Sequence, residues 1–238
     1  MIRKFINRVK SIHNGIIRWY SQYIGVCNDD AFGGKGKHSI VASNSSLKQN
    51  NVFIDDYCVI QSQTNFISNK GKLIVKKYSV ISSGCIIVPG SHQLTVGVPF
   101  YLTTTNHIND VERDIVIEED CWIGAGCILL PKSHICRGAV VGAGSVVNQV
   151  VPPYAVVVGS PARIISTKFS IEQIMKHESF LYPPEERMSE DELKELFASL
   201  YQGFNSIGVD NLNEEDIKQI EELRRKIGMK TYVGSNTD

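Results

Sequence analysis

The chain has 238 residues, 42% of them hydrophobic, and equal numbers of basic and acidic side chains, 25 of each. This composition is ordinary for a globular protein and argues against disorder and against a nucleic-acid partner. Because no run of eighteen apolar residues and no secretory signal occurs, we expect a cytoplasmic protein without membrane-spanning helices or disulfides.

The first predicted segment, residues 1–28, is an amphipathic helix. It carries five basic side chains and no acidic ones. Its apolar side chains recur at helical spacing over residues 2–24: Ile2, Phe5, Ile6, Val9, Ile12, Ile16, Tyr20 and Tyr23. We expect this face to cap the open end of the following domain. Peripheral contact with an anionic membrane surface through residues 2–24 is the alternative.

A period of six residues organises the next predicted domain, residues 29–168. After an irregular entry rich in Gly, Ser and Asn, aliphatic side chains occupy every sixth position in three stretches: Ile54 and Ile60; Val75, Ile81 and Ile87; and Ile117, Ile123, Leu129, Ile135, Val141 and Val147. This spacing matches neither an α-helix nor a flat strand. It predicts a coil of short strands, in which each side chain stacks on its equivalent in the next turn.

Two other positions of each hexad are also restricted. Small side chains fill the fifth position, including four of the six cysteines: Cys58, Cys85, Cys121 and Cys127. We therefore expect these thiols to pack inward rather than to bind metal or form disulfides. Gly or Asp often occupies the fourth position, which favours a turn with positive φ at each corner.

The repeat stops after Ile87 and resumes shortly before Trp122. Residues 93–113 lie between and are predicted to form a loop that leaves the coil directly after His92. A loop on a rigid scaffold is a favourable place for functional side chains.

Residues 169–238 form a third predicted segment with a different character. It is acidic, with fifteen acids against eight bases in 171–238, and helices are predicted at 170–180, 189–201 and 213–227. Ser189 begins the second of these, with acidic residues in its first turn. We expect a solvated packing or association element here.

The segment from Ile115 to Ile165 contains CWIGAG, VVGAGSVV and VPPYAVVVGSPARII. These motifs resemble the hexapeptide-repeat acetyltransferases, including the maltose, galactoside, Nod-factor and polysaccharide O-acetyltransferases. The resemblance implies an all-β fold, a left-handed parallel β-helix, to which the N-terminal helix and the helical C-terminal tail predicted above are attached. It also implies a homotrimer, with acetyl-CoA lying as cosubstrate between coils of adjacent subunits.

Five positions are implied by the resemblance to contact acetyl-CoA. Small side chains at Ala125 and Ala143 would let the pantetheine arm reach the main chain, and Asn148 stands where relatives often have Thr. Arg163, with Lys168 assisting, would face the phosphates or the adenine, because guanidinium groups offer paired donors and stacking.

His92 stands where relatives carry a catalytic histidine, so it is the expected general base. His107 is its competitor, but it lies only fifteen residues before Trp122 and leaves a shorter return loop. It is expected to line the acceptor pocket, with Trp122 forming part of the wall. His134 lies within regular hexads and is expected to be structural.

The predicted activity is transfer of an acetyl group to a hydroxyl of a sugar or surface-glycan precursor. N-acetylation of an amino sugar and a non-catalytic trimeric binding module remain alternatives. Carbonic anhydrases share this prism but need three zinc-binding histidines, two of them close in sequence on adjoining coils. No such pair is recognisable around the repeat, so we expect no metal.

Overall fold

A computed structural model describes residues 32–42, 44–47, 50–68, 70–107, 109–210 and 212–230. The predicted N-terminal helix and its membrane contact lie outside these residues. The chain divides into two compact units, of which the first extends to Pro153 and includes Val157–Arg163. The second contains Tyr154–Val156 and the residues from Ile164 onward. None of the described helices is long and apolar enough to span a membrane.

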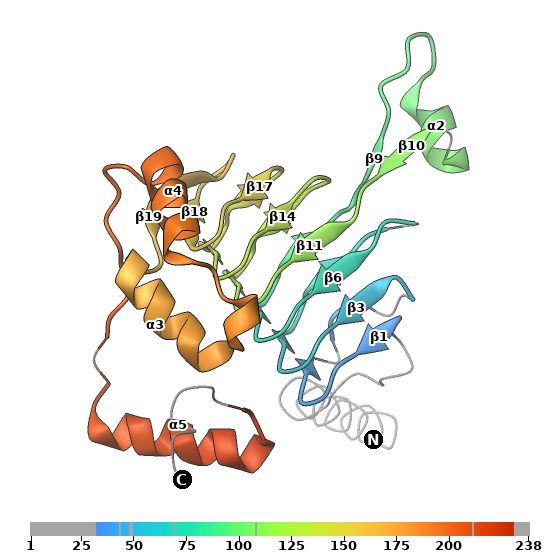
Figure 1. Cartoon of the computed structure of the whole chain (residues 1–238). Coiled ribbons are helices and arrows are strands. Elements are labelled where there is room, and N and C mark those ends of the chain that lie inside the picture. The colour runs from blue at the N-terminus through green and yellow to red at the C-terminus, as the bar shows by residue number, and fades with distance from the viewer. Residues whose placement is uncertain are drawn as a thin grey trace, which may run out of the picture. The chain divides into compact units, whose positions relative to one another are not determined.

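The first unit is a three-sided parallel β-helix, in which the chain visits three faces in turn (Figure 1). Face 1 holds β1 (Gly34–Lys35), β3 (Val52–Ile54), β6 (Leu73–Val75), β11 (Ile115–Ile117), β14 (His134–Ile135) and β17 (Val150–Val151). Face 2 holds β2 (Ile40–Val41), β4 (Val59–Ile60), β7 (Val80–Ile81), β12 (Trp122–Ile123) and β15 (Val140–Val141). Face 3 holds β5 (Asn65–Phe66), β8 (Ile86–Ile87), β13 (Ile128–Leu129) and β16 (Val146–Val147).

The predicted hexad positions form the core of this unit. Parallel pairing places Ile81 beside Ile123 on face 2 and Ile87 beside Leu129 on face 3. All the predicted aliphatic positions and the four small-slot cysteines are buried. Apolar side chains therefore stack in columns along the axis, and the predicted inward packing of these thiols is confirmed.

The corners of the coil use left-handed backbone, as the fourth hexad position predicts. Asp120 and Gly126 have φ values of 57° and 68°. Larger residues adopt the same conformation in the earlier coils, for example Tyr57 and Tyr78. The corner geometry is therefore imposed by the coil as a whole, and glycine is one of several residues that tolerate it.

The interruption of the repeat is an ordered excursion from the corner between faces 3 and 1 (Figure 1). It consists of β9 (Gly90–His92), helix α2 (Phe100–Asn106) and β10 (Asp110–Glu112). The two strands pair antiparallel, so they form a ribbon that projects from the coil. His92 thus lies inside the first strand of the ribbon, while the sequence placed it just before the loop.

The second unit contains the predicted C-terminal helices. Strands β18 (Ala155–Val158) and β19 (Arg163–Thr167) carry the chain between the units. The helical elements are α3 (Ile171–Leu181), the 3-10 turn η2 (Pro184–Glu186), α4 (Glu190–Leu200) and α5 (Glu214–Ile227). The side chains of Ser170 and Ser189 cap α3 and α4, and Asn213 caps α5. Tyr154, Ile174 and Leu193 form the buried core of this unit.

Candidate functional site

Both candidate histidines contact one carboxylate in the excursion. Nδ1 of His92 lies 2.6 Å from Oδ1 of Asp110, and Nδ1 of His107 lies 2.9 Å from Oδ2. Asp110 is the register partner of His92 across the ribbon, and His107 ends helix α2 with a left-handed φ of 47°. The fold thus assembles an imidazole–carboxylate–imidazole group from side chains that lie within residues 92–110.

Asp110 also determines which imidazole nitrogens are available. Its hydrogen bonds to His92 and then to His107 lower the pKa of this carboxyl below its ordinary value. An ionised carboxylate accepts hydrogen bonds only, so the Nδ1 atom of each neutral imidazole carries the proton and donates it. Nε2 of His92 then carries a lone pair, as a general base requires.

The two imidazoles differ in how firmly they are held. The side chain of His92 is 35% exposed and stands on a paired strand, whereas that of His107 is 56% exposed and follows a seven-residue helix. Their ring centroids are 6.3 Å apart. His92 is therefore the more firmly held of the two imidazoles.

Glu112 fastens the base of the ribbon to the preceding coil. Its Oε2 atom accepts hydrogen bonds from Ser68 Oγ at 2.9 Å, from the N–H of Lys70 at 2.7 Å and from the N–H of Gly71. A Cβ atom at Gly71 would lie 2.8 Å from Pro89 and 3.1 Å from the Glu112 carboxylate. The absence of a side chain at Gly71 therefore permits this close approach.

A pocket lies between the ribbon and the corner that it leaves. It has a volume of about 590 Å³, and its lining includes His92, His107, Asp110, Glu112 and Phe66. This volume is within the range of small-molecule sites. The pocket combines apolar walls with the two imidazoles, so it can hold and deprotonate a small polar acceptor.

Trp122, Ala125 and Ala143 lie at a different edge of the coil from the histidines. Trp122 stands on face 2, is exposed, and donates from Nε1 to Ser82 Oγ at 3.1 Å. Ala125 and Ala143 are exposed at the corner between faces 2 and 3 and stack in successive coils, since Gly144 N–H donates to Ala125 O. Within one chain, face 3 separates this edge from His92.

The other predicted cofactor contacts are also distributed. Asn148 is exposed after β16, at the corner between faces 3 and 1. Arg163 is exposed in the first unit, and its Nη1 donates to Ala162 O at 2.9 Å. Lys168 belongs to the second unit, where its ammonium lies 5.2 Å from the centre of the Phe169 ring.

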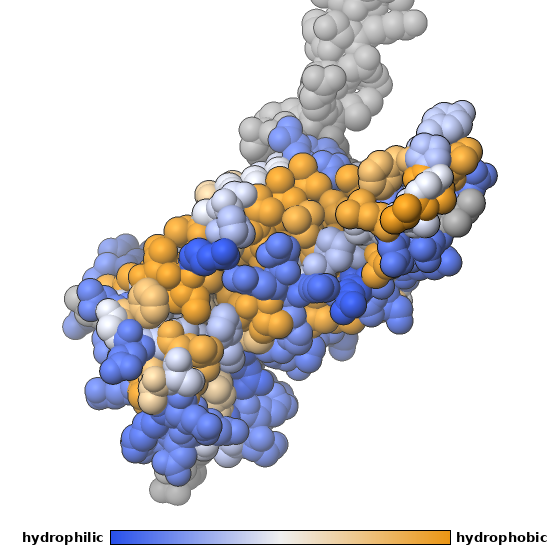
Figure 2. Space-filling model, turned by 90° about the horizontal axis from the view of Figure 1, so that it is seen from above, coloured by the Kyte–Doolittle hydropathy of each residue, from blue (hydrophilic) through white to orange (hydrophobic). Residues whose placement is uncertain are grey.

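Apolar surface is exposed on all three faces of the coil. Ile40 and Trp122 on face 2, Ile86 on face 3 and Val150 on face 1 are all exposed. Figure 2 shows apolar side chains gathered in a broad band along the coils. Exposed apolar areas of this kind mark interaction surfaces.

Asp110 and Glu112 are the site residues that sequence reasoning missed. Both lie within the hexad interruption, where the six-residue register gives no information. The available signal was the spacing of Asp110 three residues after His107, within the segment NHIND.

The sequence and fold are similar to known acetyltransferases. Residues 114–149 match the family model described as bacterial transferase hexapeptide (six repeats). A probable macrolide acetyltransferase from Lysinibacillus sphaericus is 31% identical over 130 residues, which cover 50% of this chain and 71% of that protein. A chloramphenicol acetyltransferase from Klebsiella aerogenes is 44% identical over 115 residues, 43% of this chain. The chain spans only about half of that relative's length, 55%.

A solved structure shares the fold. It is a hexapeptide-repeat-containing acetyltransferase from Vibrio cholerae O1 biovar eltor, complexed with acetyl-coenzyme A. It is 26% identical, has a TM-score of 0.52, and the match covers 59% of this chain and 73% of that one. The predicted fold, a left-handed parallel β-helix, is confirmed by this likeness together with the three-faced parallel topology.

Proposed function

The chain belongs to the hexapeptide-repeat acetyltransferase family, and on this premise we propose that it is an acetyl-CoA-dependent O-acetyltransferase with His92 as general base. The observation that carries the proposal is the imidazole of His92, held by Asp110 at the wall of a pocket of about 590 Å³. The proposed acceptor is a hydroxyl of a sugar or surface-glycan precursor. The crystallised relative from Vibrio cholerae was complexed with acetyl-coenzyme A, which supports the choice of cosubstrate.

His92 performs the proton transfers of the proposed reaction. When bound, acetyl-CoA supplies an acetyl group on a thioester and a thiolate leaving group. Nε2 of His92 takes the acceptor's hydroxyl proton as the oxygen bonds to the acetyl carbon. Asp110 accepts from Nδ1 and stabilises the imidazolium. After the C–S bond breaks, His92 returns the proton to the thiolate sulfur, so the products are an acetyl ester and coenzyme A.

The corner between faces 2 and 3 fits the pantetheine arm of the cosubstrate. Ala125 and Ala143 are exposed there, and their backbone N–H groups donate no hydrogen bond within the described part of the chain. These two N–H groups lie one coil apart, so they can donate to successive amide carbonyls of an extended pantetheine arm. Asn148, Arg163 and Lys168 are proposed to contact the remainder of coenzyme A, with Arg163 on its phosphates or adenine.

A second copy of the chain is proposed to complete the site. His92 lies on the excursion at the corner between faces 3 and 1, whereas Trp122 lies on face 2 and the two alanines lie at the corner between faces 2 and 3. One chain alone therefore does not bring them together. A homotrimer, in which one subunit supplies His92 and its neighbour supplies the alanine corner, would do so. The exposed apolar side chains on all three faces support such an assembly.

The proposal of a sugar acceptor is inferred from the groups that line the pocket. Asp110, Glu112 and the two imidazoles give it several hydrogen-bonding groups beside the apolar Phe66 and Val88. Polar groups that hold hydroxyls, with apolar walls between them, suit a sugar ring. His107 is proposed to contact a hydroxyl next to the reacting one, and Trp122 of a neighbouring subunit is proposed to form part of the wall.

The test is coenzyme A release from acetyl-CoA with a panel of hydroxyl and amino sugars. Wild type is compared with His92→Ala and with His38→Asn, which removes an imidazole from the first coil. We expect ester products with hydroxyl sugars. His92→Ala should lose turnover, and His38→Asn should turn over as wild type does. Amide products alone would establish N-acetylation instead, and no release with any acceptor would favour a non-catalytic module.

A further inference from the structure

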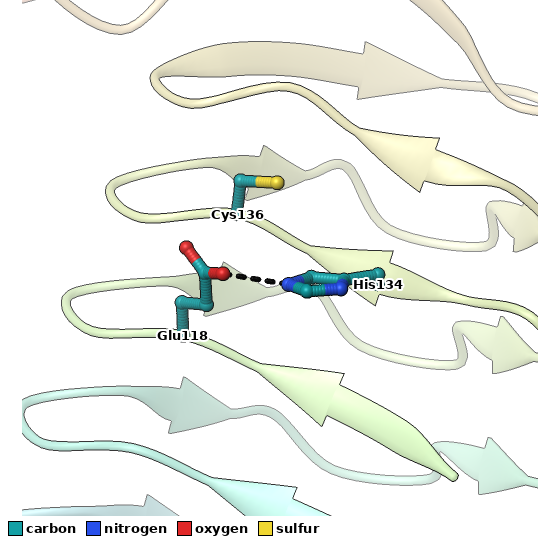
Figure 3. A group of neighbouring side chains, drawn as sticks. All are labelled: Glu118, His134 and Cys136. Atoms are coloured by element: carbon teal, nitrogen blue, oxygen red, sulfur yellow. Dashed lines mark hydrogen bonds and ion pairs between the residues drawn. The ribbon is translucent and has the colours of Figure 1, made fainter.

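A second group of convergent side chains lies on face 1, outside the proposed acetyl-transfer site. Glu118, His134 and Cys136 each present one ligand atom, and these three atoms lie within 4.8 Å of one another (Figure 3). Nε2 of His134 is 2.6 Å from Oε1 of Glu118. Oxygen, nitrogen and sulfur thus meet at one half-buried point of the surface.

The coil itself brings these residues together. Parallel pairing of β11 with β14 places Val116 beside His134 and Ile117 beside Ile135, so Glu118 and Cys136 occupy equivalent positions in successive turns. Adjacent strands are about 4.8 Å apart. Residues two apart on a strand point to the same side, so His134 and Cys136 share the outward side with Glu118. The pairing of the two strands therefore places all three side chains on the same side of face 1, in successive turns.

The surroundings orient one of the three candidate ligands. The N–H of Arg137 donates to Oε2 of Glu118 at 2.8 Å, which orients the carboxylate and leaves Oε1 toward His134. Two neighbouring cationic side chains, Lys76 and Arg137, form ion pairs with Glu119 at 3.5 and 3.6 Å. A backbone donor thus supports Glu118 in the way that outer-shell groups support metal ligands.

We propose that Glu118, His134 and Cys136 bind a divalent transition-metal ion of the zinc type. Carboxylate, imidazole and thiolate are the three side-chain ligands that Zn²⁺ uses, and three protein ligands leave a fourth position for water. The ion would join two successive coils on face 1. The inference goes beyond the proposed acetyl transfer and does not depend on it, and it departs from the metal-free protein that the sequence predicts.

Binding must displace a proton from the thiol. Burial, and then the charge of Glu118, raise the pKa of Cys136 to about 12. The ion replaces that proton, as it does whenever a cysteine becomes a ligand. The carboxylate and imidazole, 2.6 Å apart without an ion, must also separate slightly, because ligands on one tetrahedral zinc are roughly 3.4 Å apart at bond lengths near 2.1 Å.

Cobalt titration tests the site, because Co²⁺ bound to a thiolate gives a charge-transfer band in the near ultraviolet. The full-length protein, reduced and stripped with a chelator, is titrated with Co²⁺ and then with Zn²⁺. We expect one ion per chain, a thiolate band, and displacement of cobalt by zinc. Zinc should also raise the melting temperature of wild type.

Variants decide which residues hold the ion. Cys136→Ser should lose the thiolate band and the zinc-induced melting shift. Loss of an outer-shell partner typically weakens metal binding by roughly 10- to 100-fold. His134→Ala and Glu118→Gln each remove a direct ligand, so their affinity for the ion should fall by more than that. Two controls should bind as wild type does: Cys121→Ser, which removes a buried thiol from the same coil, and His92→Ala, which removes an imidazole from the excursion.

Several results would overturn the inference. If no stoichiometric ion binds wild type, Glu118 and His134 form a hydrogen-bonded pair only. If the band survives in Cys136→Ser, another thiol holds the metal. If His92→Ala abolishes binding, the ion sits in the excursion instead. Circular dichroism of each variant shows that the fold is retained, so a lost band reports a lost ligand.

Discussion

The coils and the excursion of the first unit are built in different ways. In the coils, six-residue spacing buries one aliphatic side chain per hexad, and the neighbouring strands of each face pair in parallel. The excursion consists of an antiparallel ribbon and a helix. Its apolar side chains are largely exposed, including Leu94 after β9 and Phe100 and Tyr101 on α2. The contact between Asp110 and His92 joins its two strands, and Glu112 fastens it to the preceding coil.

The two regions therefore contribute different properties: the coil contributes stability, and the excursion carries the groups of the proposed chemistry. The coil is stabilised by burial of many similar side chains. Each contributes a share of the unfolding free energy, and none can reach a substrate. The excursion buries little, yet it carries both candidate bases and the carboxylate that holds them. Substitutions in the two regions should therefore affect different measurements.

The largest expected effect is on turnover in the excursion. Removing the base in His92→Ala should lower kcat by roughly 10²- to 10⁴-fold, the usual contribution of general acid–base catalysis. The free energy of unfolding should change by less than about 0.5 kcal/mol, as for most surface substitutions. Steady-state kinetics and denaturant unfolding measure the two quantities. If His107→Ala lost more turnover than His92→Ala, the roles of the two histidines would be exchanged.

A core substitution in the coil should show the opposite pattern. Leu129→Ala removes a fully buried side chain that stacks on Ile87 and Val147. It should lower the free energy of unfolding by about 2–5 kcal/mol through lost burial and a cavity. The kcat of the molecules that remain folded should be unchanged. A selective loss of kcat without destabilisation would contradict the separation.

Asp110→Asn should produce an intermediate effect. The amide keeps the shape but can donate to Nδ1, which permits the wrong tautomer of His92. We expect kcat to fall by about 10- to 100-fold, as for loss of other orienting partners, with a small change in KM. The pH profile of kcat should shift as well, because the carboxylate no longer stabilises the imidazolium. A changed KM with an unchanged pH profile would mean that Asp110 serves structure alone.

Acid titration gives a further distinction between the regions. Since the folded pKa of Asp110 lies below its ordinary value of 3.8, its contribution is complete above that pH and is lost as the pH falls through the folded pKa. Wild type should therefore lose stability relative to Asp110→Asn below about pH 3.8, as followed by acid unfolding of both proteins. Parallel acid unfolding curves would show that this ion-pair group does not stabilise the fold.

The smallest expected effect lies in the second unit. Ser189 caps α4 by accepting from the N–H of Glu192, and Glu192 reaches back to the N–H of Ser189. Ser189→Ala should cost about 1 kcal/mol of unfolding free energy, the usual value of such a cap. Turnover should be unaffected, because the proposed chemistry lies elsewhere. A loss of activity would show that this helix supports the site.

The sequence predicted those parts of the molecule that follow a repeat or a local signal. The columns through Ile81, Ile123 and Leu129 follow from the period of six, and the helix beginning after Ser189 follows from its cap. His92 was predicted to be the base through resemblance, and its role stays a prediction. Asp110 was missed because its contact with His92 depends on an antiparallel ribbon that no periodicity encodes.

The cluster of Glu118, His134 and Cys136 shows a different limit. Its residues fall in register once the coil length of eighteen residues is known, since 118 and 136 differ by one turn. The usual zinc signals in a sequence are ligand pairs that lie close together along the chain. In a β-helix the nearest neighbours of a residue lie one turn away, so ligands can converge along the coil axis without such a signal.

A crystal structure of the protein with coenzyme A bound tests the central claim most directly. The account predicts that the sulfur lies within hydrogen-bonding reach of Nε2 of His92, with the pantetheine arm along Ala125 and Ala143 of a neighbouring subunit. A sulfur beside His107, or coenzyme A bound away from the excursion, would contradict it.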